Sequence, residues 1–296
     1  MLTLSTNFLR AGFVALAIAA PIVSIAETTN STRQSFSFLG IGPTFVDYEE
    51  TTTPSEDLNV RSDAHGTLLS QRSGAYVAYD DDWGFYFNTT SYIGTNTIDE
   101  EWEINDTLVQ ENIFSLKRTA IQLLVTRRVE GNHYAVFGGA NIEKSFTRYG
   151  WTYPPQDEYQ VQRETRNITE DVSQLVAYVG YEYNEFFTTK EPGWRYQFQA
   201  LAGLALYSET LNNADGDNTF DASMDGYLFR FSPTVGYQLN ENFMAALAVD
   251  VNINRRDEDR VTYNAEVNGQ NAEVTRILPS NHFWSVSPTF NLYWSF

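Results

Sequence analysis

Long stretches of the chain alternate between apolar and polar residues. Between 225 and 239 one parity reads Tyr227, Phe229, Phe231, Pro233, Val235, Tyr237 and Leu239, and the other reads Arg230, Ser232, Thr234, Gly236 and Gln238. The segments 194–209 and 243–256 alternate in the same way. Successive side chains of a strand point to opposite faces, whereas a helix repeats every 3.6 residues. The alternation therefore predicts amphipathic β-strands.

The connections between such segments alternate in length. We expect strands at 35–48, 70–80, 83–95, 111–128, 134–149, 169–183, 194–209, 225–239, 243–256 and 282–296. Short connections at 80–82, 130–133, 184–193 and 240–242 alternate with longer ones at 49–69, 96–110, 150–168, 210–224 and 257–281. This order predicts an all-β fold, a closed antiparallel up-and-down transmembrane β-barrel with short periplasmic turns and long extracellular loops. We expect ten strands, with eight or twelve as alternatives.

The segment 283–296 has one apolar row that ends in Phe290, Leu292, Trp294 and Phe296. It resembles the last strand of Gram-negative outer-membrane β-barrels, which ends in Phe and is read by the barrel-assembly machinery. The resemblance implies an outer-membrane location, both termini on the periplasmic side, and contact with outer-membrane lipid and lipopolysaccharide. To close the barrel, this strand should pair antiparallel with 35–48. The missing amide of Pro288 should interrupt the ladder there.

Residues 1–26 have the pattern of a cleaved signal peptide. Arg10 precedes an apolar run from 11 to 23, and the small residues Ser24 and Ala26 flank Ile25 just before the expected cleavage after Ala26. A membrane anchor is the alternative, but the run is broken by Pro21 and is short for a spanning helix. We expect residues 27–296 to form a single barrel domain.

The composition narrows the range of partners. Without the leader, which contains Arg10 as its single charge, 18 Lys and Arg (19 − 1) face 38 Asp and Glu, a net charge of −20. Such an acidic balance excludes nucleic acid as the natural partner. The chain has no cysteine, so an exported protein of this length must be stabilised by its architecture. A soluble periplasmic barrel or sandwich is the alternative fold, because periodicity alone does not tell which face points inward.

Polar residues of the strands should line a narrow lumen. The candidates are Arg72, Arg195, Arg230, Asp250 and Asn252, and Arg230 and Asp250 should lie at similar depth on adjacent strands. A hydrogen-bonded ionic plug is the favoured interpretation, because ten strands enclose little more space than side chains can fill. A narrow path for ions or small solutes is the alternative. No cofactor or resident metal site is expected.

Omptins, the ten-stranded outer-membrane proteases, resemble the chain in size and inferred topology. That resemblance would imply an Asp pair and an Asp–His pair at the extracellular side. The histidines are His65, His133 and His282. The Asp run at 80–82 falls at the periplasmic side, which is the wrong end for this site. Asp257 and Asp259 are at the outer rim, but no Asp-x-His spacing accompanies them. Ser280 near His282 is only a weak signal for a lipid hydrolase. We therefore expect no enzyme.

Two long connections are rich in carboxylates. The first contains Asp99, Glu100, Glu101, Glu103 and Asp106, and the second contains Asp215, Asp217, Asp221 and Asp225. A solvated surface is the favoured interpretation, and Ca²⁺ or Mg²⁺ bridging to lipopolysaccharide phosphates is the alternative. The function that fits is an integral, porin-like outer-membrane barrel with a plugged polar lumen and a structural or surface-interaction role. A narrow channel and a rim-sited hydrolase are the alternatives.

Overall fold

The computed structural model describes residues 34–94, 98–152, 163–164, 167–213, 218–223, 226–267 and 270–296. The expected signal peptide at 1–26 lies outside these residues. Within them the secondary structure is almost entirely β-strand. The described chain contains no helix of the length and apolarity that crossing a bilayer requires.

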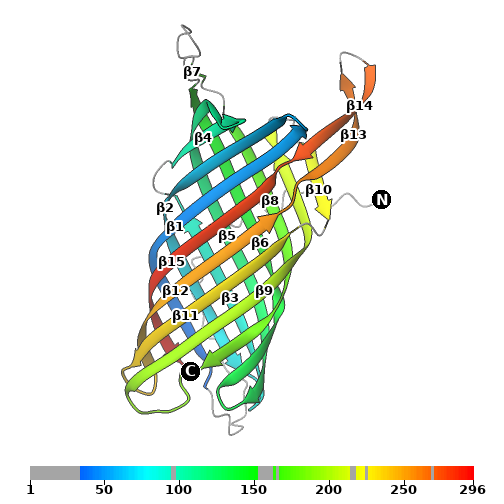
Figure 1. The fold of residues 1–296 in the computed structure, drawn as a ribbon. Coiled ribbons are helices and arrows are strands. Elements are labelled where there is room, and N and C mark those ends of the chain that lie inside the picture. The colour runs from blue at the N-terminus through cyan, green and yellow to red at the C-terminus, as the bar shows by residue number, and fades with distance from the viewer. Residues whose placement is uncertain are drawn as a thin grey trace.

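Ten long strands pair in a closed antiparallel ring in the described part of the chain (Figure 1). They are β1 (Phe36–Ser55), β2 (Leu58–Ala78), β3 (Trp83–Ile93), β5 (Thr107–Glu130), β6 (His133–Thr152), β8 (Ile168–Asn184), β9 (Gly193–Asn212), β11 (Tyr227–Gln238), β12 (Phe243–Arg256) and β15 (Ser280–Ser295). Each strand pairs with its successor, and β15 pairs with β1. The expected closed up-and-down barrel is confirmed.

The apolar rows of the strands face outward. Leu204 is 63 % exposed and Leu247 62 %, whereas Arg230 and Asp250 on the opposite parity are 8 % and 1 % exposed. Aromatic side chains near the short turns also face outward, among them Tyr79, Tyr181, Trp194, Tyr196, Tyr237 and Phe243. An apolar outer wall with an aromatic rim and a polar interior is the pattern of a membrane barrel, so the soluble alternative is excluded.

The long connections contain far more regular structure than expected. β1 and β2 continue to a tight turn where Ser55 pairs with Leu58. β4 (Ile98–Ile104) pairs with β2 and β5 beyond the end of β3, and Asn105 and Asp106 form its turn with positive φ. The other short strands are β7 (Arg163–Glu164), β10 (Asn218–Ser223), β13 (Asp259–Val267) and β14 (Gln270–Leu278). Extended hairpins thus replace most of the predicted loops.

The β13–β14 hairpin is a separate two-stranded sheet, and Glu258 at its base joins it to β1. The Glu258 carboxylate accepts hydrogen bonds from the Thr53 backbone N–H (2.9 Å) and the Thr52 hydroxyl (3.1 Å). These bonds, the Thr53 backbone bond first, and the nearby Arg260 hold the pKa of Glu258 below its usual value. The hairpin is therefore tied to the barrel by a carboxylate that stays ionised at neutral pH.

The seam between β1 and β15 forms as expected, with an interruption at Pro288. Ile41 pairs with Phe290 and Phe45 with Val286, and the pairs between them are missing. Gly42 lies against this gap, because a Cβ atom added to it would be 2.0 Å from the Pro288 carbonyl oxygen. A residue without a side chain is therefore required opposite Pro288.

Replacing Gly42 with alanine is expected to lower the free energy of unfolding by about 1 to 3 kcal/mol, the usual cost of overpacking. Urea unfolding of the protein in detergent micelles or lipid measures the change. Gly131 is a control for a lost glycine because a Cβ there meets no atom within 4 Å, although its positive φ adds a local cost. A Gly42→Ala seam as stable as the natural one would contradict the close contact.

Candidate functional site

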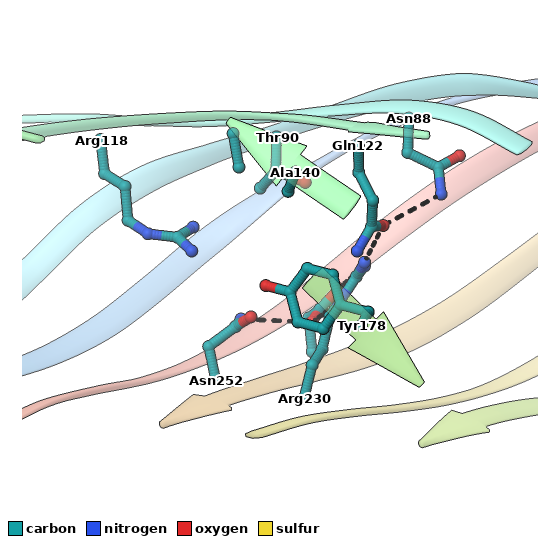
Figure 2. A pocket seen from close by; sticks show the side chains of 10 residues that line it. Asn88, Thr90, Arg118, Gln122, Ala140, Tyr178, Arg230 and Asn252 are labelled. Atoms are coloured by element: carbon teal, nitrogen blue, oxygen red, sulfur yellow. Dashed lines mark hydrogen bonds and ion pairs between the residues drawn. The ribbon is translucent and has the colours of Figure 1, made fainter. Parts of the chain in front are cut away.

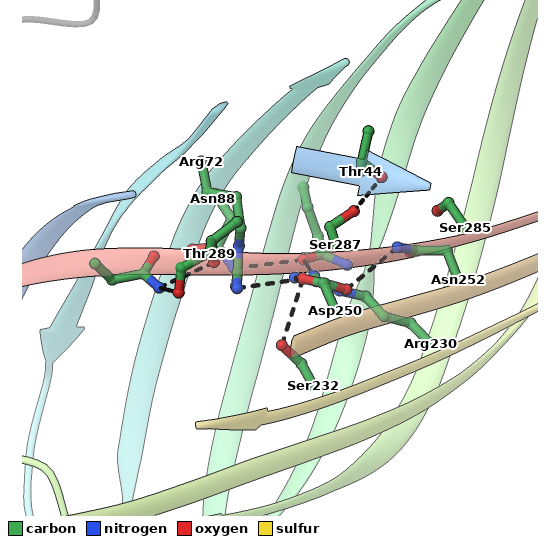
Figure 3. Close-up of polar contacts among 12 residues, drawn as sticks. Thr44, Arg72, Asn88, Arg230, Ser232, Asp250, Asn252, Ser285, Ser287 and Thr289 are labelled. Carbon is green, nitrogen blue, oxygen red and sulfur yellow. Dashed lines mark hydrogen bonds and ion pairs between the residues drawn. The ribbon is translucent and has the colours of Figure 1, made fainter. Parts of the chain in front are cut away.

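The interior of the barrel is a stack of side-chain layers, and the middle layer is ionic. The Arg230 guanidinium donates to Asp250 through Nε (2.8 Å) and Nη2 (2.6 Å), a bidentate pair between adjacent strands β11 and β12. Arg72 Nη1 lies 3.4 Å from the same carboxylate (Figure 3). All three side chains are at most 10 % exposed. Two cations from different strands thus share one carboxylate in the centre of the lumen.

Neutral side chains extend this layer across the barrel. Arg230 Nη1 donates to Gln122 Oε1 on β5 (2.8 Å), which also accepts from Asn88 on β3 (3.4 Å). On the other side, the Asn252 amide donates to Asp250 (3.2 Å) and to the Tyr92 hydroxyl (3.0 Å). The cavity next to these groups has a volume of about 20 Å³ (Figure 2), room for roughly one water molecule.

The predicted lumen residues divide into two groups. Arg72, Arg230, Asp250 and Asn252 belong to the middle layer. Arg195 lies instead at the short-turn end, where it donates to Gln238 Oε1 (3.2 Å) and to the carbonyl of Glu191 (2.7 Å). It therefore fastens the β8–β9 turn and takes no part in the central network, although its parity on β9 matches that of the interior residues.

An aromatic layer closes the barrel at the short-turn end. Phe186 and Phe187, in the connection between β8 and β9, are 0 % and 1 % exposed. Their rings lie 6.4 and 5.6 Å from that of Phe36, and Phe186 lies 5.1 Å from Tyr293. Phe187 has a φ of 53°, unusual for a bulky residue. The turn is therefore folded back into the barrel as a stopper, which the polar neighbours in its sequence did not reveal.

Glu182 holds this stopper in place. Its carboxylate is completely buried and accepts hydrogen bonds from the Tyr86 hydroxyl (2.8 Å), the Asn184 amide (2.8 Å) and the Gln199 amide (2.9 Å). Asn184 Oδ1 in turn accepts from the Phe186 backbone N–H (2.7 Å). A fully hydrogen-bonded carboxylate thus connects the barrel wall to the stopper.

A third layer fills the long-hairpin end. The rings of Tyr48, Phe114 and Phe146 stack at 4.7 to 5.7 Å between centroids. Beside them Arg148 bridges Glu50 (2.9 Å) and Glu100 (2.9 Å). Glu100 was expected on a solvated loop, but it is 0 % exposed and also accepts from Ser62 and Asn112. That expectation was wrong because residues 98–104 form a strand whose even-numbered side chains point inward.

A groove lies on the outer wall at the long-hairpin end. It has a volume of about 430 Å³ and is lined by Arg61, Asp63, His65, Asp99, Glu101 and Glu103. Asp63 pairs with Glu101 across β2 and β4, and Asp63 Oδ1 lies 3.4 Å from His65 Nδ1. Asp63 and His65 thus form an Asp-x-His pair that was not among the predicted site residues.

Of the other two histidines, His282 pairs with Glu49 across β15 and β1. His133 on β6 contacts Tyr181 at the short-turn end, whereas the groove lies at the long-hairpin end. No group of three or more His, Asp or Glu side chains suited to a metal ion occurs among the described residues. Asp215, Asp217 and Asp225, and the side chain of Asp221, lie outside the described part.

The fold and its outer wall define a class of protein, the Gram-negative outer-membrane β-barrels. Outer membrane protease OmpT from Escherichia coli matches with a TM-score of 0.62 and 11 % identity, over 93 % of this chain and 99 % of that one. The transport unit of autotransporter AIDA-I from Escherichia coli matches at 0.39 and 10 %, over 92 % and 94 %. No family model and no curated protein matches by sequence. The expected resemblance is confirmed at the level of the fold, which supports the outer membrane as the location.

Proposed function

We propose that the protein is an integral outer-membrane barrel with a plugged lumen and a structural or surface-interaction role. The observation that carries the proposal is the filled interior, in which three side-chain layers leave cavities of only about 10 to 20 Å³. The surface that could meet other molecules is the long-hairpin end, which carries the charged outer groove. We assign that end to the cell exterior and both termini to the periplasm, because short turns are periplasmic in bacterial barrels.

This function predicts that the barrel does not conduct. In planar bilayers the natural protein should show no steady current, because no cavity described in its interior is wider than about one water molecule. Arg230→Gln should be equally silent, since the stopper at Phe186 and Phe187 remains. Regular ohmic steps from the natural protein, changed in ion selectivity by Arg230→Gln, would instead establish the narrow channel.

The partners that follow from this placement are lipids and assembly factors. The outward apolar rows suit outer-membrane lipid, and the terminal row of Phe290, Leu292, Trp294 and Phe296 suits recognition by the barrel-assembly machinery. The outer groove lies beyond the apolar rows, where lipopolysaccharide head groups would be found. Its carboxylates repel phosphate, so Ca²⁺ or Mg²⁺ would have to bridge the two. Binding of lipopolysaccharide to the protein, measured first in Mg²⁺ and then with a chelator in its place, tests this contact. The chelator should weaken the binding.

A hydrolase at the same groove is the second candidate, because Asp63 and His65 face Glu101 across the two strands. The likeness to OmpT supports the fold and not the activity. These side chains point away from the lumen, since Ala64 between them is 1 % exposed and packs inside. Peptide hydrolysis that disappears with His65→Ala but not with His133→Ala, at the short-turn end of the barrel, would establish this candidate. Equal background with both variants would eliminate it.

A further inference from the structure

The buried charges of the interior are unequally matched. Arg148 pairs with Glu50 and Glu100, while Arg72 and Arg230 share Asp250. Three other basic side chains, Arg118, Lys144 and Arg256, are each 5 % exposed and have no carboxylate within ion-pair distance in the described part of the chain. A buried charge without a counter-charge is costly. Glu170 and Glu182 are also buried, but Glu170 lines a cavity together with Lys144 and Arg256, and Glu182 lies at the short-turn end. The positive charge that remains unmatched is therefore that of Arg118.

The surroundings of Arg118 contain a second basic group and two aromatic rings. This residue pairs in register with Lys144 across β5 and β6, so two basic side chains lie directly side by side. Both rest on the Phe283 ring, at 5.8 and 5.5 Å, and Arg118 also lies 5.1 Å from the Tyr92 ring. Cation–π contacts offset part of the cost but do not neutralise the charge. Arg118 Nε has no hydrogen-bond partner, and a guanidinium cannot lose its proton in a protein.

The Arg118 guanidinium extends into the cavity of about 20 Å³ in the middle layer (Figure 2). The lining includes the hydroxyls of Thr90 and Tyr178 and the amide of Gln122, all of which can donate hydrogen bonds. The charged lining residues besides Arg118 are Arg230 and Asp250, which neutralise each other. The cavity is therefore positive by the one charge of Arg118. Its size suits a single water molecule or a halide ion and excludes phosphate or a carboxylic acid.

We propose that this cavity binds one small monovalent anion, chloride in the cell, with the Arg118 guanidinium as its principal ligand. The anion supplies the counter-charge that Arg118 lacks. This site requires only the closed and filled barrel, so it is independent of any role of the outer groove.

Bromide identifies such an ion directly. Crystals grown in bromide instead of chloride should show an anomalous scattering peak in this cavity, within hydrogen-bonding reach of Arg118. In solution, the melting temperature in chloride or bromide should exceed that in gluconate of equal ionic strength by about 2 °C or more. Arg118→Met should abolish the difference, whereas Arg61→Met, which removes a part-exposed and ion-paired arginine, should retain it.

A cavity without an anomalous peak, together with equal melting temperatures in all three salts, would overturn the proposal in favour of a bound water. A peak in the crystal without any salt-specific stabilisation would show binding at crystal concentration only, and would also overturn it. If Arg118→Met does not fold, the comparison of salts and the anomalous map of the natural protein still decide.

Discussion

Replacing Asp250 with alanine is expected to lower the free energy of unfolding by about 3 to 5 kcal/mol, the cost of breaking a buried ion pair from one side. The Asp250 carboxylate lies 2.6 Å from Arg230 and 3.4 Å from Arg72, and its side chain is 2 % exposed. Without it, the guanidinium groups of Arg72 and Arg230 remain buried in the middle layer without their shared carboxylate. The bond from Arg230 to Gln122 remains. The barrel wall cannot turn the two arginine side chains outward, because the outer face of each strand carries the apolar side chains and the inner face carries the polar ones.

Urea unfolding in micelles or lipid vesicles, followed by tryptophan fluorescence, measures this loss. Asp257→Ala is the matched control, because Asp257 is 73 % exposed and its contact with Arg255 is 3.6 Å. An exposed pair contributes at most about 1 kcal/mol. Losses of equal size in the two variants would contradict the ionic middle layer.

Replacing Leu247 with arginine is the second change with a large expected effect. Leu247 is 62 % exposed and pairs with Val235 and Phe290, which also face outward. An arginine on the lipid-facing wall near the bilayer centre costs about 2 to 4 kcal/mol. A leucine exposed to water would behave differently, because its replacement by a charged residue is close to neutral. The size of the effect therefore distinguishes lipid from water at this surface.

Val129→Arg is the matched control for position. Val129 is 70 % exposed and lies at the short-turn end of β5, where an arginine reaches the interface and costs about 0 to 1 kcal/mol. Unfolding in lipid vesicles gives both values, and the heat-dependent shift in SDS gels reports whether each barrel still closes. A tolerated arginine at 247 would place this wall in water and end the membrane interpretation.

The alternation of residue types predicted the strands, and the alternating connection lengths and the resemblance of the last strand predicted the closed barrel. The pairing of 36–51 with 280–295 follows from the need to leave no open sheet edge, and the interruption at Pro288 follows from a missing amide. Arg230 and Asp250 were predictable as neighbours because a three-residue turn fixes the register of β11 and β12. What periodicity left undecided was the direction of the faces, and the exposure of Leu204 and Leu247 settles it.

Other features depend on contacts between residues distant in sequence. The stopper at Phe186 and Phe187 arises because a polar turn folds inward, and nothing in local propensity distinguishes it from a solvated turn. The Arg148 pairs with Glu50 and Glu100 join residues 98 and 48 positions away. The outer groove requires β4 to continue beyond β3, which a stretch rich in Asp and Glu does not indicate. Glu50, Glu100 and the groove residues lie on strands where a polar composition had predicted loops.

The stopper also makes the two ends of the barrel unequal. Phe186 and Phe187 fill the short-turn end, so a solute on that side meets closely packed aromatic rings and no opening. An organic ligand of this protein would therefore have to approach from the long-hairpin end or along the outer wall.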